Sequence, residues 1–488
     1  MIIRWVSEDG KRKWMYPIKQ DIHTKGRIAK QVSTKAKVIG ITKVNIPSPL
    51  HPIIPYYVLL LEDEYGNRIP KKTMKEHKIG EAYEIKPAKT DGAVVITKIK
   101  YDTEEYLKES LKLLHDYKIN PEDKILIKPS IIEAAYGYQA VTTNPNLLDA
   151  LLSILKGNDV RDIIVAEQSM LGNDTIESAK KSEIWDICKK HGINFVDLAE
   201  AEYVEKEYEG FKFNIAKGLF ERKIINLPVM KTNSQIGISG AVENMVRAVD
   251  AETQKRMFAD DIEKTLPKLF KVLPSFLTIG DATIGMQAQG PTSLGEPAFL
   301  NMLVVSKDPV ALDAVFAEMG ILEIPAYIKE ASKIGVGNAN TKTMEIVGED
   351  LEAIKLHLRP ADKNASSHPK IKLIDGKANP YIFNSALEIT SKLIGLLGEE
   401  INLVIGSQII QDMLNGKSRL VAYGKEAIEK LREFGIKPVA EISEDIDDTE
   451  KVMLLKAILE NPEKKGINIA DKIKSKIAKI GAKIKGKF

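Results

Sequence analysis

The sequence predicts an α/β core built on a mostly parallel sheet, with an all-β module before it and a smaller α/β unit after it. Short apolar and β-branched runs separated by turns fill the first 100 residues. From Tyr101 on, amphipathic helices alternate with buried strands such as 124–127, an order typical of a parallel sheet with both faces covered. We therefore expect four segments: 1–100, 101–378, 379–462 and 463–488.

Composition narrows the class of protein. The chain has 488 residues, a net charge of +3 and one cysteine, Cys188. The near balance of charge argues against a nucleic-acid protein, and a single cysteine excludes an internal disulfide and a cysteine-ligated iron–sulfur cluster. The N-terminus lacks a signal-peptide pattern, and no apolar run reaches membrane-spanning length. We expect a cytoplasmic location.

The first segment is expected to contain five short strands, including runs within Val32 to Ile46 and Tyr56 to Leu61, with a turn at 64–68. This spacing favours a small barrel. The stretch 37–85 is similar to the OB-fold of domain-of-unknown-function family 35, which accompanies acyl-thioester enzymes. Residues 5–21 resemble that family's zinc ribbon, but the metal-binding cysteines are absent, so zinc is not expected. The resemblance implies a surface for a protein partner; the alternative is a generic barrel used for packing.

Polar residues recur where the strands of the core are expected to end. Lys128 and Glu167 close two strands, and Asn144-Pro145 has the pattern of a helix start. Farther along, Lys231 follows the strand 223–228, and Asp281 is expected at the end of the strand 276–280. Ligands of open α/β sheets bind at this edge. We expect Lys128, Glu167, Lys231, Asn244, Asp281 and Asp313 to converge there.

Lys231 and Asp281 are the candidate catalytic residues. A lysine at this edge can bind a carboxylate or phosphate, or act as a base when desolvated; the alternative is an ion pair with a neighbouring carboxylate. Asp281 can orient a hydroxyl, accept a proton or hold a metal, and it can equally cap a turn. The candidate ligand-binding residues are Lys128, Thr142, Glu167, Ser239, Gly240, Asn244, Gln289 and Asp313. Ser239 and Gly240 precede a probable helix, 242–247, whose backbone N–H groups can face an anion.

The core resembles domain-of-unknown-function family 362 over about 124–320. The motifs that carry this resemblance are Leu-Pro-Val-Met-Lys-Thr-Asn at 227–233, Ser-Gly-Ala-Val-Glu-Asn at 239–244, Asp-Ala at 281–282, Gly-Pro at 290–291 and Ser-Lys-Asp-Pro-Val-Ala-Leu-Asp at 306–313. Two positions depart from the family pattern: Asn233 replaces a histidine, and Glu243 replaces a lysine. Chemistry that needs either group is not expected here.

Two functions of different classes follow. The first is an enzyme, or an enzyme subunit, that binds a small anionic metabolite (a carboxylate, a phosphate or an acyl-thioester) at the strand ends. The second is a non-catalytic scaffold or cofactor-delivery subunit that uses the OB-like module for a partner. An open pocket at Lys128, Lys231 and Asp281 would favour the first, and a buried, mutually satisfied cluster the second. The sequence identifies no cofactor, and the histidines show no metal-ligand spacing.

The last two segments differ in character. Residues 381–460 are expected to form a small α/β unit with strands at 403–406 and 419–424 and a helix at 425–434, whereas 361–380 has the composition of a linker. The tail, 463–488, places isoleucines at helical spacing against a face of lysines. It has three interpretations: a helix docked on the body, a helix at an anionic membrane surface through 467–488, or a nucleic-acid contact.

Overall fold

The computed structural model describes residues 2–15, 18, 20–48, 50–85, 93–100, 102–114, 118–362, 370–393, 396 and 398–460. The chain divides into two compact units. As far as they are described, the first contains 1–169, 173–250 and 266–361, and the second contains 170–172, 251–265 and 362–488.

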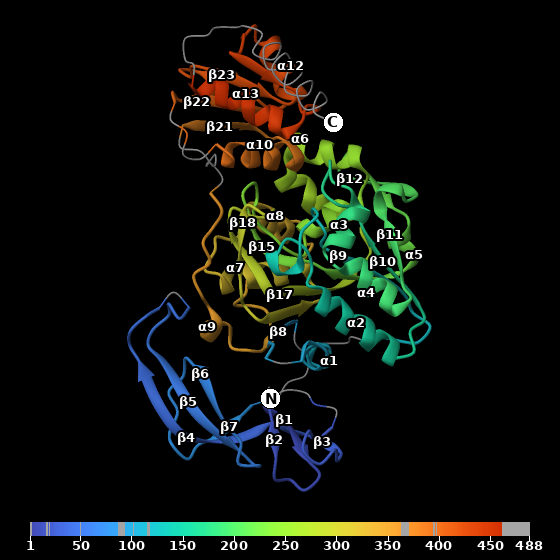
Figure 1. The fold of residues 1–488 in the computed structure, drawn as a ribbon, viewed down its shortest axis with the longest axis vertical. Coiled ribbons are helices and arrows are strands. Elements are labelled where there is room, and N and C mark those ends of the chain that lie inside the picture. Colours follow the sequence, from blue (N-terminus) through green and yellow to red (C-terminus); the bar gives the residue numbers. More distant parts are fainter. Residues whose placement is uncertain are drawn as a thin grey trace, which may run out of the picture. The chain divides into compact units, whose positions relative to one another are not determined.

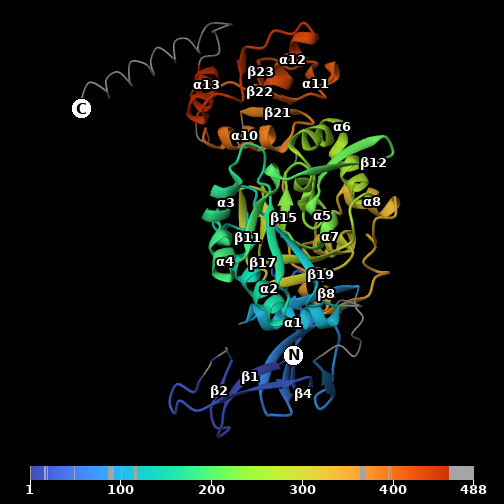
Figure 2. The ribbon, with the colours of Figure 1, turned by 90° about the vertical axis from the view of Figure 1, so that its right-hand side faces the viewer.

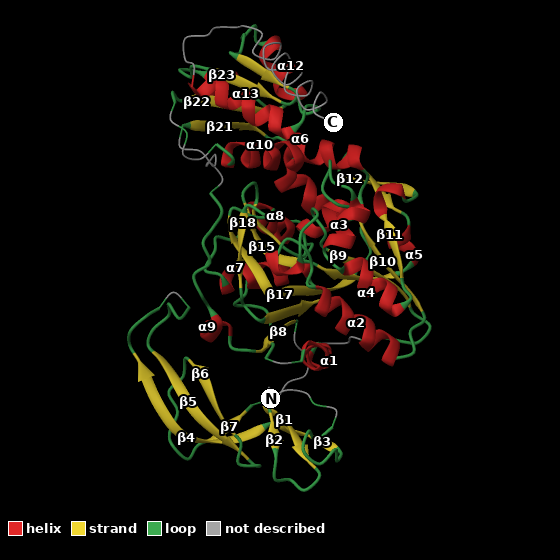
Figure 3. Cartoon of the chain, in the orientation of Figure 1, coloured by secondary structure: helices red, strands yellow, loops and turns green. Residues whose placement is uncertain are grey.

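The N-terminal part of the first unit is built from antiparallel strands, drawn as arrows in Figure 3. A three-stranded sheet has the order β2-β1-β3, and a four-stranded sheet has the order β6-β5-β4-β7. The strands are β1 (Ile2–Ser7), β2 (Lys13–Trp14), β3 (Ile28–Ser33), β4 (Lys35–Val44), β5 (Tyr56–Asp63), β6 (Arg68–Thr73) and β7 (Ala82–Glu84). Strands in both predicted runs and the turn at 64–68 are confirmed, but the segment contains more strands than the five expected. Among the described residues, the pairing is that of open sheets and does not close a barrel.

The core of the first unit is an eleven-stranded sheet whose main path is β11-β10-β9-β14-β17-β19-β8-β20 (Figure 1). The half from β11 to β17 is parallel, whereas β19 is antiparallel to both of its neighbours. The strands of the path are β8 (Val94–Lys98), β9 (Lys124–Pro129), β10 (Asp162–Glu167), β11 (Asn194–Asp197), β14 (Lys223–Leu227), β17 (Phe276–Ala288), β19 (Met302–Ser306) and β20 (Ile346–Gly348). The predicted α/β core with a mostly parallel sheet is confirmed in this half.

Shorter strands extend the sheet beyond β14 and β17. They are β15 (Val229–Asn233), β16 (Gly237–Ser239) and β18 (Gly295–Ala298). The prediction that Asp281 ends its strand is wrong, because β17 runs on to Ala288. After Pro228 interrupts β14, β15 takes over as the neighbour of β17, and β18 pairs with its last residues. The N–H of Asp281 donates to the carbonyl of Pro228 over 2.7 Å at this break.

Both faces of the core sheet are covered, which explains its almost continuous apolar strands. On one face, Ile125, Ile127 and Ile225 pack in a cluster with leucines of α1 (Thr103–Leu113), α2 (Pro145–Gly157) and the turns near them. On the other face, Leu126 and Ile224 pack against α5 (Gly218–Glu221) and the 3-10 helix η3 (Glu243–Ala248). Figure 2 shows α2 and α4 (Ile184–His191) on one side of the strands and α5 and α7 (Pro309–Met319) on the other.

Helices and one hairpin connect the strands of this unit. The helices are α1 (Thr103–Leu113), α2 (Pro145–Gly157), α3 (Thr175–Lys181), α4 (Ile184–His191), α5 (Gly218–Glu221), α7 (Pro309–Met319), α8 (Ala326–Lys333) and α9 (Leu351–Ile354), with 3-10 helices η1 (Gly137–Gln139), η2 (Leu198–Glu200) and η3 (Glu243–Ala248). A further helix, α6 (Ala251–Phe270), has residues 251–265 in the second unit and residues 266–270 in the first. The hairpin is β12 (Tyr203–Tyr208) with β13 (Phe211–Ala216). The helix expected at 242–247 is therefore a 3-10 helix. Asn144 caps α2 with Pro145 as its first residue, as predicted.

The second unit contains a four-stranded parallel sheet in the order β21-β22-β23-β24. Its elements are β21 (Ile371–Gly376), α10 (Pro380–Ser391), β22 (Ile401–Gly406), α11 (Gln411–Leu414), β23 (Leu420–Tyr423), α12 (Lys425–Glu433), β24 (Ala440–Ile442) and α13 (Asp448–Glu460). The small α/β unit is confirmed. The linker expected at 361–380 is wrong in its second half, because the apolar residues Ile371 and Ile374 are buried within β21.

The strand β8 belongs to the core and not to the N-terminal segment. The core sheet includes β8, which the expected boundary at residue 100 left on the N-terminal side. The expected amphipathic tail, 463–488, lies outside the described residues. Among the helices that are described, none combines the length and the apolar character needed to cross a bilayer.

Candidate polar site at the carboxyl edge of the core sheet

An ion pair between neighbouring strands lies at the centre of the site. Lys128 ends the apolar run of β9, Glu167 ends β10, and the Lys128 Nζ lies 2.7 Å from Glu167 Oε1. Neither side chain has exposed surface. Burial lowers the pKa of Lys128 to about 8, although Glu167 opposes this effect. Burial also raises the pKa of Glu167 from its ordinary value, against the charges of Lys128 and Arg247. A single buried charge would be costly at this place, so each of the two side chains depends on the opposite charge of the other.

The 3-10 helix η3 contributes three polar side chains to the same place. Arg247 Nη1 lies 3.3 Å from Glu243 Oε1, and its Nη2 donates to Asn244 Oδ1 over 3.3 Å. Asn244 in turn donates to Asn226 Oδ1 of β14 over 2.8 Å. These contacts tie η3 to the sheet. We call Lys128, Glu167, Asn226, Lys231, Glu243, Asn244 and Arg247 the polar cluster.

Lys231 differs from Lys128 because it has no carboxylate partner. Its ammonium donates to the Val141 carbonyl over 2.6 Å and to Ser130 Oγ over 3.3 Å. Within the described part of the chain, no carboxylate oxygen lies within 4.0 Å of it. The side chain is 1 % exposed. Burial, together with the positive charge of Arg247, lowers the pKa of Lys231 to about 7. An amine with this pKa exists in both protonation states near neutral pH.

Asp281 is buried beside the start of α2. Its Oδ2 accepts the N–H of Asn144 over 2.7 Å, and its Oδ1 accepts the N–H and the hydroxyl of Thr283 over 3.0 and 2.6 Å. Burial raises the pKa of Asp281, while these bonds and the charge of Lys231 lower it. Lys231 and Asp281 thus lie on the same edge of the sheet. The three bonds fit the capping interpretation of Asp281.

Asp313 holds the two residues that precede η3. Its Oδ1 accepts the N–H of Ala241 over 2.6 Å, and its Oδ2 accepts that of Val242 over 3.0 Å. Burial raises the pKa of Asp313 to about 7, against these two bonds. A Cβ on Gly240 would lie 2.1 Å from Asp313 Oδ1, so only glycine fits this approach. The lack of a side chain at Gly240 therefore allows the carboxylate of Asp313 to approach the backbone here.

The other predicted residues occupy different places. Thr142, 1 % exposed, adjoins Val141 in the loop over Lys231. Ser239 Oγ accepts a hydrogen bond from Asn233 Nδ2 over 2.8 Å inside the β15–β16 hairpin, so its side chain serves the hairpin. Gln289 is partly buried in the turn after β17.

Several buried polar atoms in and beside the cluster have no hydrogen-bond partner among the described residues. They are Glu167 Oε2, Arg247 Nε and Thr142 Oγ1. Arg247 Nε lies 3.9 Å from Glu167 Oε1, which is too long for a hydrogen bond. Buried polar atoms of folded proteins are normally paired. The cluster is therefore buried but not mutually satisfied.

Residues 125–318 match the model of a protein family described as Domain of unknown function (DUF362). The core carries a DUF362 domain. The matched range agrees with the one that the motifs predicted, and it includes every residue of the polar cluster. No curated protein matches the chain.

The two departures from the DUF362 motifs have structural roles. Asn233 Oδ1 accepts the N–H groups of Gln235 and Ile236 over 2.8 and 3.2 Å and so closes the β15–β16 turn. Glu243 forms the ion pair with Arg247. Within the described part of the chain, no group of three or more His, Cys, Asp or Glu side chains is arranged to hold a metal ion.

The sequence reasoning missed Arg247 and Asn226, which belong to the polar cluster of the DUF362 domain. Arg247 stands four residues after Glu243 in a stretch whose other side chains are mostly apolar, and this spacing is a recognisable signal for an ion pair on a helix. Asn226 stands within the buried run of β14. A polar residue in such a run indicates a buried hydrogen bond.

Proposed function

We propose that the carboxyl edge of β9, β10 and β15 binds a small anionic metabolite, namely a carboxylate, a phosphate or an acyl-thioester, with Lys231 as its charged anchor. One observation carries this proposal: a lysine that is 1 % exposed has no carboxylate within 4.0 Å among the described residues. A buried ammonium is costly without a counter-charge. An anionic ligand supplies that charge.

The unpaired atoms around the cluster suggest how the ligand is held. Arg247 Nε and Thr142 Oγ1 are free to donate to an anion, and Glu167 Oε2 is free to accept from a hydroxyl or amine of the same ligand. A pKa of about 7 also leaves part of the Lys231 population neutral near neutral pH, and in that form, in place of its role as a charged anchor, the amine can take a proton from the ligand as a general base. Asp281 supports this arrangement by holding the start of α2 against β17, because its Oδ2 accepts the N–H of Asn144 and its Oδ1 accepts that of Thr283.

Access to Lys231 requires a change in the loop 130–142, which begins at Ser130 and ends just after Val141. Both of those residues accept hydrogen bonds from the lysine. An incoming anion therefore replaces the Val141 carbonyl, and the loop moves to admit it. Loops at this edge of α/β sheets commonly act in this way.

Calorimetric titration with sodium phosphate, sodium acetate and acetyl-coenzyme A tests the proposal. We expect at least one of the three to bind, with an affinity that falls as the pH rises from 6 to 8, because the ammonium of Lys231 is needed. The substitution Lys231→Met removes that binding. Lys223→Met is the matched control, since Lys223 lies at the opposite end of β14 and pairs with Asp123. Equal binding by all three proteins, or no binding of any probe, refutes the proposal.

A second candidate is the non-catalytic scaffold or cofactor-delivery subunit, and the burial of the cluster favours it. Lys128, Glu167, Lys231 and Asp281 are all at most 1 % exposed. In this alternative the N-terminal module, which resembles an OB-fold, binds a protein partner, and 467–488 binds an anionic membrane surface. The location is then cytoplasmic and peripheral to the membrane. Failure of every anion to bind, together with liposome flotation that depends on 467–488, would favour this alternative.

A further inference from the structure

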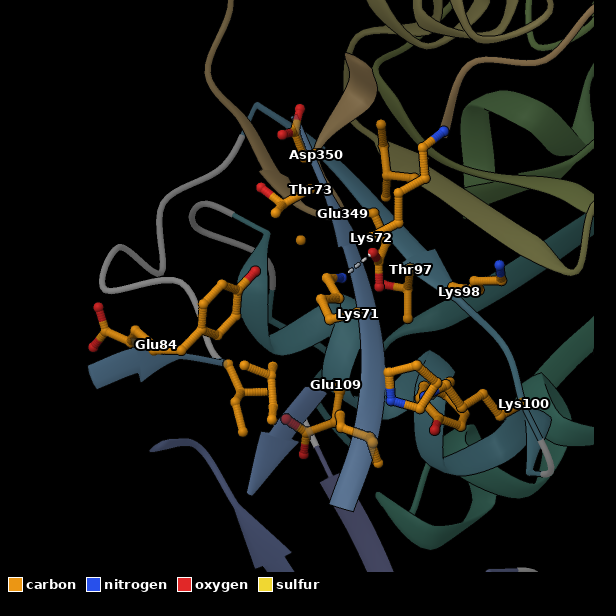
Figure 4. A pocket seen from close by; sticks show the side chains of 18 of the residues that line it. Lys71, Lys72, Thr73, Glu84, Thr97, Lys98, Lys100, Glu109, Glu349 and Asp350 are labelled. Atoms are coloured by element: carbon orange, nitrogen blue, oxygen red, sulfur yellow. Dashed lines mark hydrogen bonds and ion pairs between the residues drawn. The ribbon is translucent and has the colours of Figure 1, made fainter. Parts of the chain in front are cut away.

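A cavity of about 230 Å³ lies in the first unit between the N-terminal strands and the edge of the core sheet (Figure 4). Leu61, Ile69 and Ile96 form apolar parts of its wall. β6 contributes Lys71, Lys72 and Thr73, β8 contributes Thr97 and Lys98, and Lys100 follows β8. The cavity is separate from the polar cluster, which contributes none of its lining residues.

The lysines of this cavity outnumber the carboxylates that neutralise them. Lys71 pairs with Glu349. In contrast, Lys72, Lys98 and Lys100 have no carboxylate oxygen within 4.0 Å among the described residues. Lys72 instead has its Nζ 3.3 Å from His51 Nδ1 and 4.6 Å from the ring centre of Tyr56. Three cations therefore share one side of the cavity without direct counter-charges.

The other acidic residues of the wall, Glu84, Glu109 and Asp350, offset this charge only in part. Glu109 pairs with Lys112 outside the cavity wall, and the charge of Asp350 raises the pKa of Lys72 against the effect of burial. Asp350 Oδ1 accepts the N–H of Glu352 and so caps α9. Glu84 extends away from the labelled lysines in Figure 4. Burial lowers the pKa of Lys72, and the nearby Lys98 adds to this effect. The lysines are close enough to repel one another, a repulsion that a bound anion relieves.

Backbone geometry fixes the acidic side of the cavity. Gly348 has φ +99°, and a Cβ there would lie 2.0 Å from the Ile96 carbonyl oxygen. Only glycine allows this approach, which brings the N–H of Glu349 to 2.9 Å from the same carbonyl. Glu349 is thereby held against Lys71. Lys72, Lys98 and Lys100 remain available to a ligand.

We propose that this cavity binds a small organic phosphate, whose dianionic group lies at Lys72, Lys98 and Lys100 and whose apolar body lies against Leu61, Ile69 and Ile96. Phosphate is favoured because a monoester carries close to two negative charges at neutral pH, which suits several lysines acting as point charges. The volume limits the ligand to a size below that of most drug-like molecules.

Calorimetric titration of the full chain with phenyl phosphate, inorganic phosphate and phenol tests this proposal. Phenyl phosphate should bind more tightly than inorganic phosphate by about tenfold, because only phenyl phosphate also buries an apolar ring, and phenol should bind most weakly. The exposed double variant Lys98→Gln/Lys100→Gln should weaken phenyl phosphate by about tenfold or more. The single variant Lys72→Gln, which removes the lysine contributed by β6, should also weaken the binding of phenyl phosphate.

The control is Lys35→Gln/Lys37→Gln, which removes the same charge from exposed positions on β4 that do not line the cavity. It should bind phenyl phosphate within about twofold of the unmodified chain. Because Lys98 and Lys100 are exposed, their substitution leaves the fold intact, and circular dichroism verifies this. The proposal is overturned if phenyl phosphate does not bind, or if the cavity and control variants lose the same affinity.

Discussion

The ammonium of Lys231 lies 2.6 Å from the carbonyl oxygen of Val141, so a backbone oxygen occupies the position that a carboxylate holds in most buried lysine sites. Lys128 belongs to the same polar cluster, but its ammonium is paired with the carboxylate of Glu167. The contrast between these two lysines leads to the first two predictions.

Lys231→Met should change how stability depends on pH. The folded pKa of Lys231 is about 7, against an ordinary value of 10.5. Between these values the unfolded chain holds a proton that the folded chain lacks, so this residue makes the free energy of unfolding rise with pH, by about 1.4 kcal/mol per pH unit. In urea unfolding between pH 7.5 and 9.5, the free energy of unfolding of Lys231→Met should therefore rise less steeply with pH than that of the unmodified chain, by this amount. Lys223→Met should keep the slope, and a slope unchanged in Lys231→Met would contradict the prediction.

Breaking the pair of Lys128 and Glu167 should destabilise the protein strongly. Either Lys128→Met or Glu167→Leu leaves one buried charge without its partner, at a cost of about 3–5 kcal/mol. The double variant should be more stable than the sum of the single losses implies, because no unpaired charge remains. A double-mutant cycle in urea measures this coupling. Additive losses would mean that the two side chains do not depend on each other.

Gly240→Ala should destabilise the chain by about 2 kcal/mol, because the new Cβ would meet Asp313 Oδ1 at 2.1 Å. Asp313→Ala alone should also destabilise it, since the N–H groups of Ala241 and Val242 lose their acceptor. Combined, the two changes should cost less than their sum, as the clash is gone. Gly157→Ala is the control, because its Cβ meets nothing within 4 Å. Thermal unfolding compares the four variants, and an additive double variant would disprove the clash.

Asp281→Ala should loosen the start of α2. The Asn144 N–H loses its acceptor, and Thr283 loses both of its bonds to the carboxylate. Hydrogen exchange at the first turn of α2 should then accelerate by about tenfold or more. The first turn of α7, which Asp308 caps, serves as the internal reference and should not change. If exchange in α2 keeps its original rate, Asp281 does not hold this helix.

The periodicity of the sequence predicted much of the fold, because buried strands and helix caps are local signals. Lys124 to Ile127 and the Asn144-Pro145 cap are examples, and both occur where expected. The extent of β17 could not be predicted, since it depends on β15 and β18, which pair with it from other parts of the chain. The small barrel predicted from the strand spacing is not confirmed, because the described N-terminal strands pair as two separate open sheets.

The candidate site was predictable in its strand-end residues but not in its connections. Lys128 and Glu167 lie near the ends of β9 and β10 as expected, whereas Lys231, expected after a strand, lies within the short strand β15. That Lys128 has a carboxylate partner while Lys231 has a carbonyl depends on the path of the loop 130–142, which no local pattern specifies. Likewise, Asp313 was expected to face the site, yet its carboxylate turns to the backbone of Ala241 and Val242.

Native mass spectrometry of the purified full-length protein tests the central claim, that Lys231 anchors a small anion, most directly. The protein is first incubated with sodium phosphate, sodium acetate and acetyl-coenzyme A in separate samples. We predict a non-covalent adduct of one probe on the unmodified chain and on Lys223→Met, and its absence on Lys231→Met. Identical spectra for Lys231→Met and the unmodified chain, with or without an adduct, would contradict the claim.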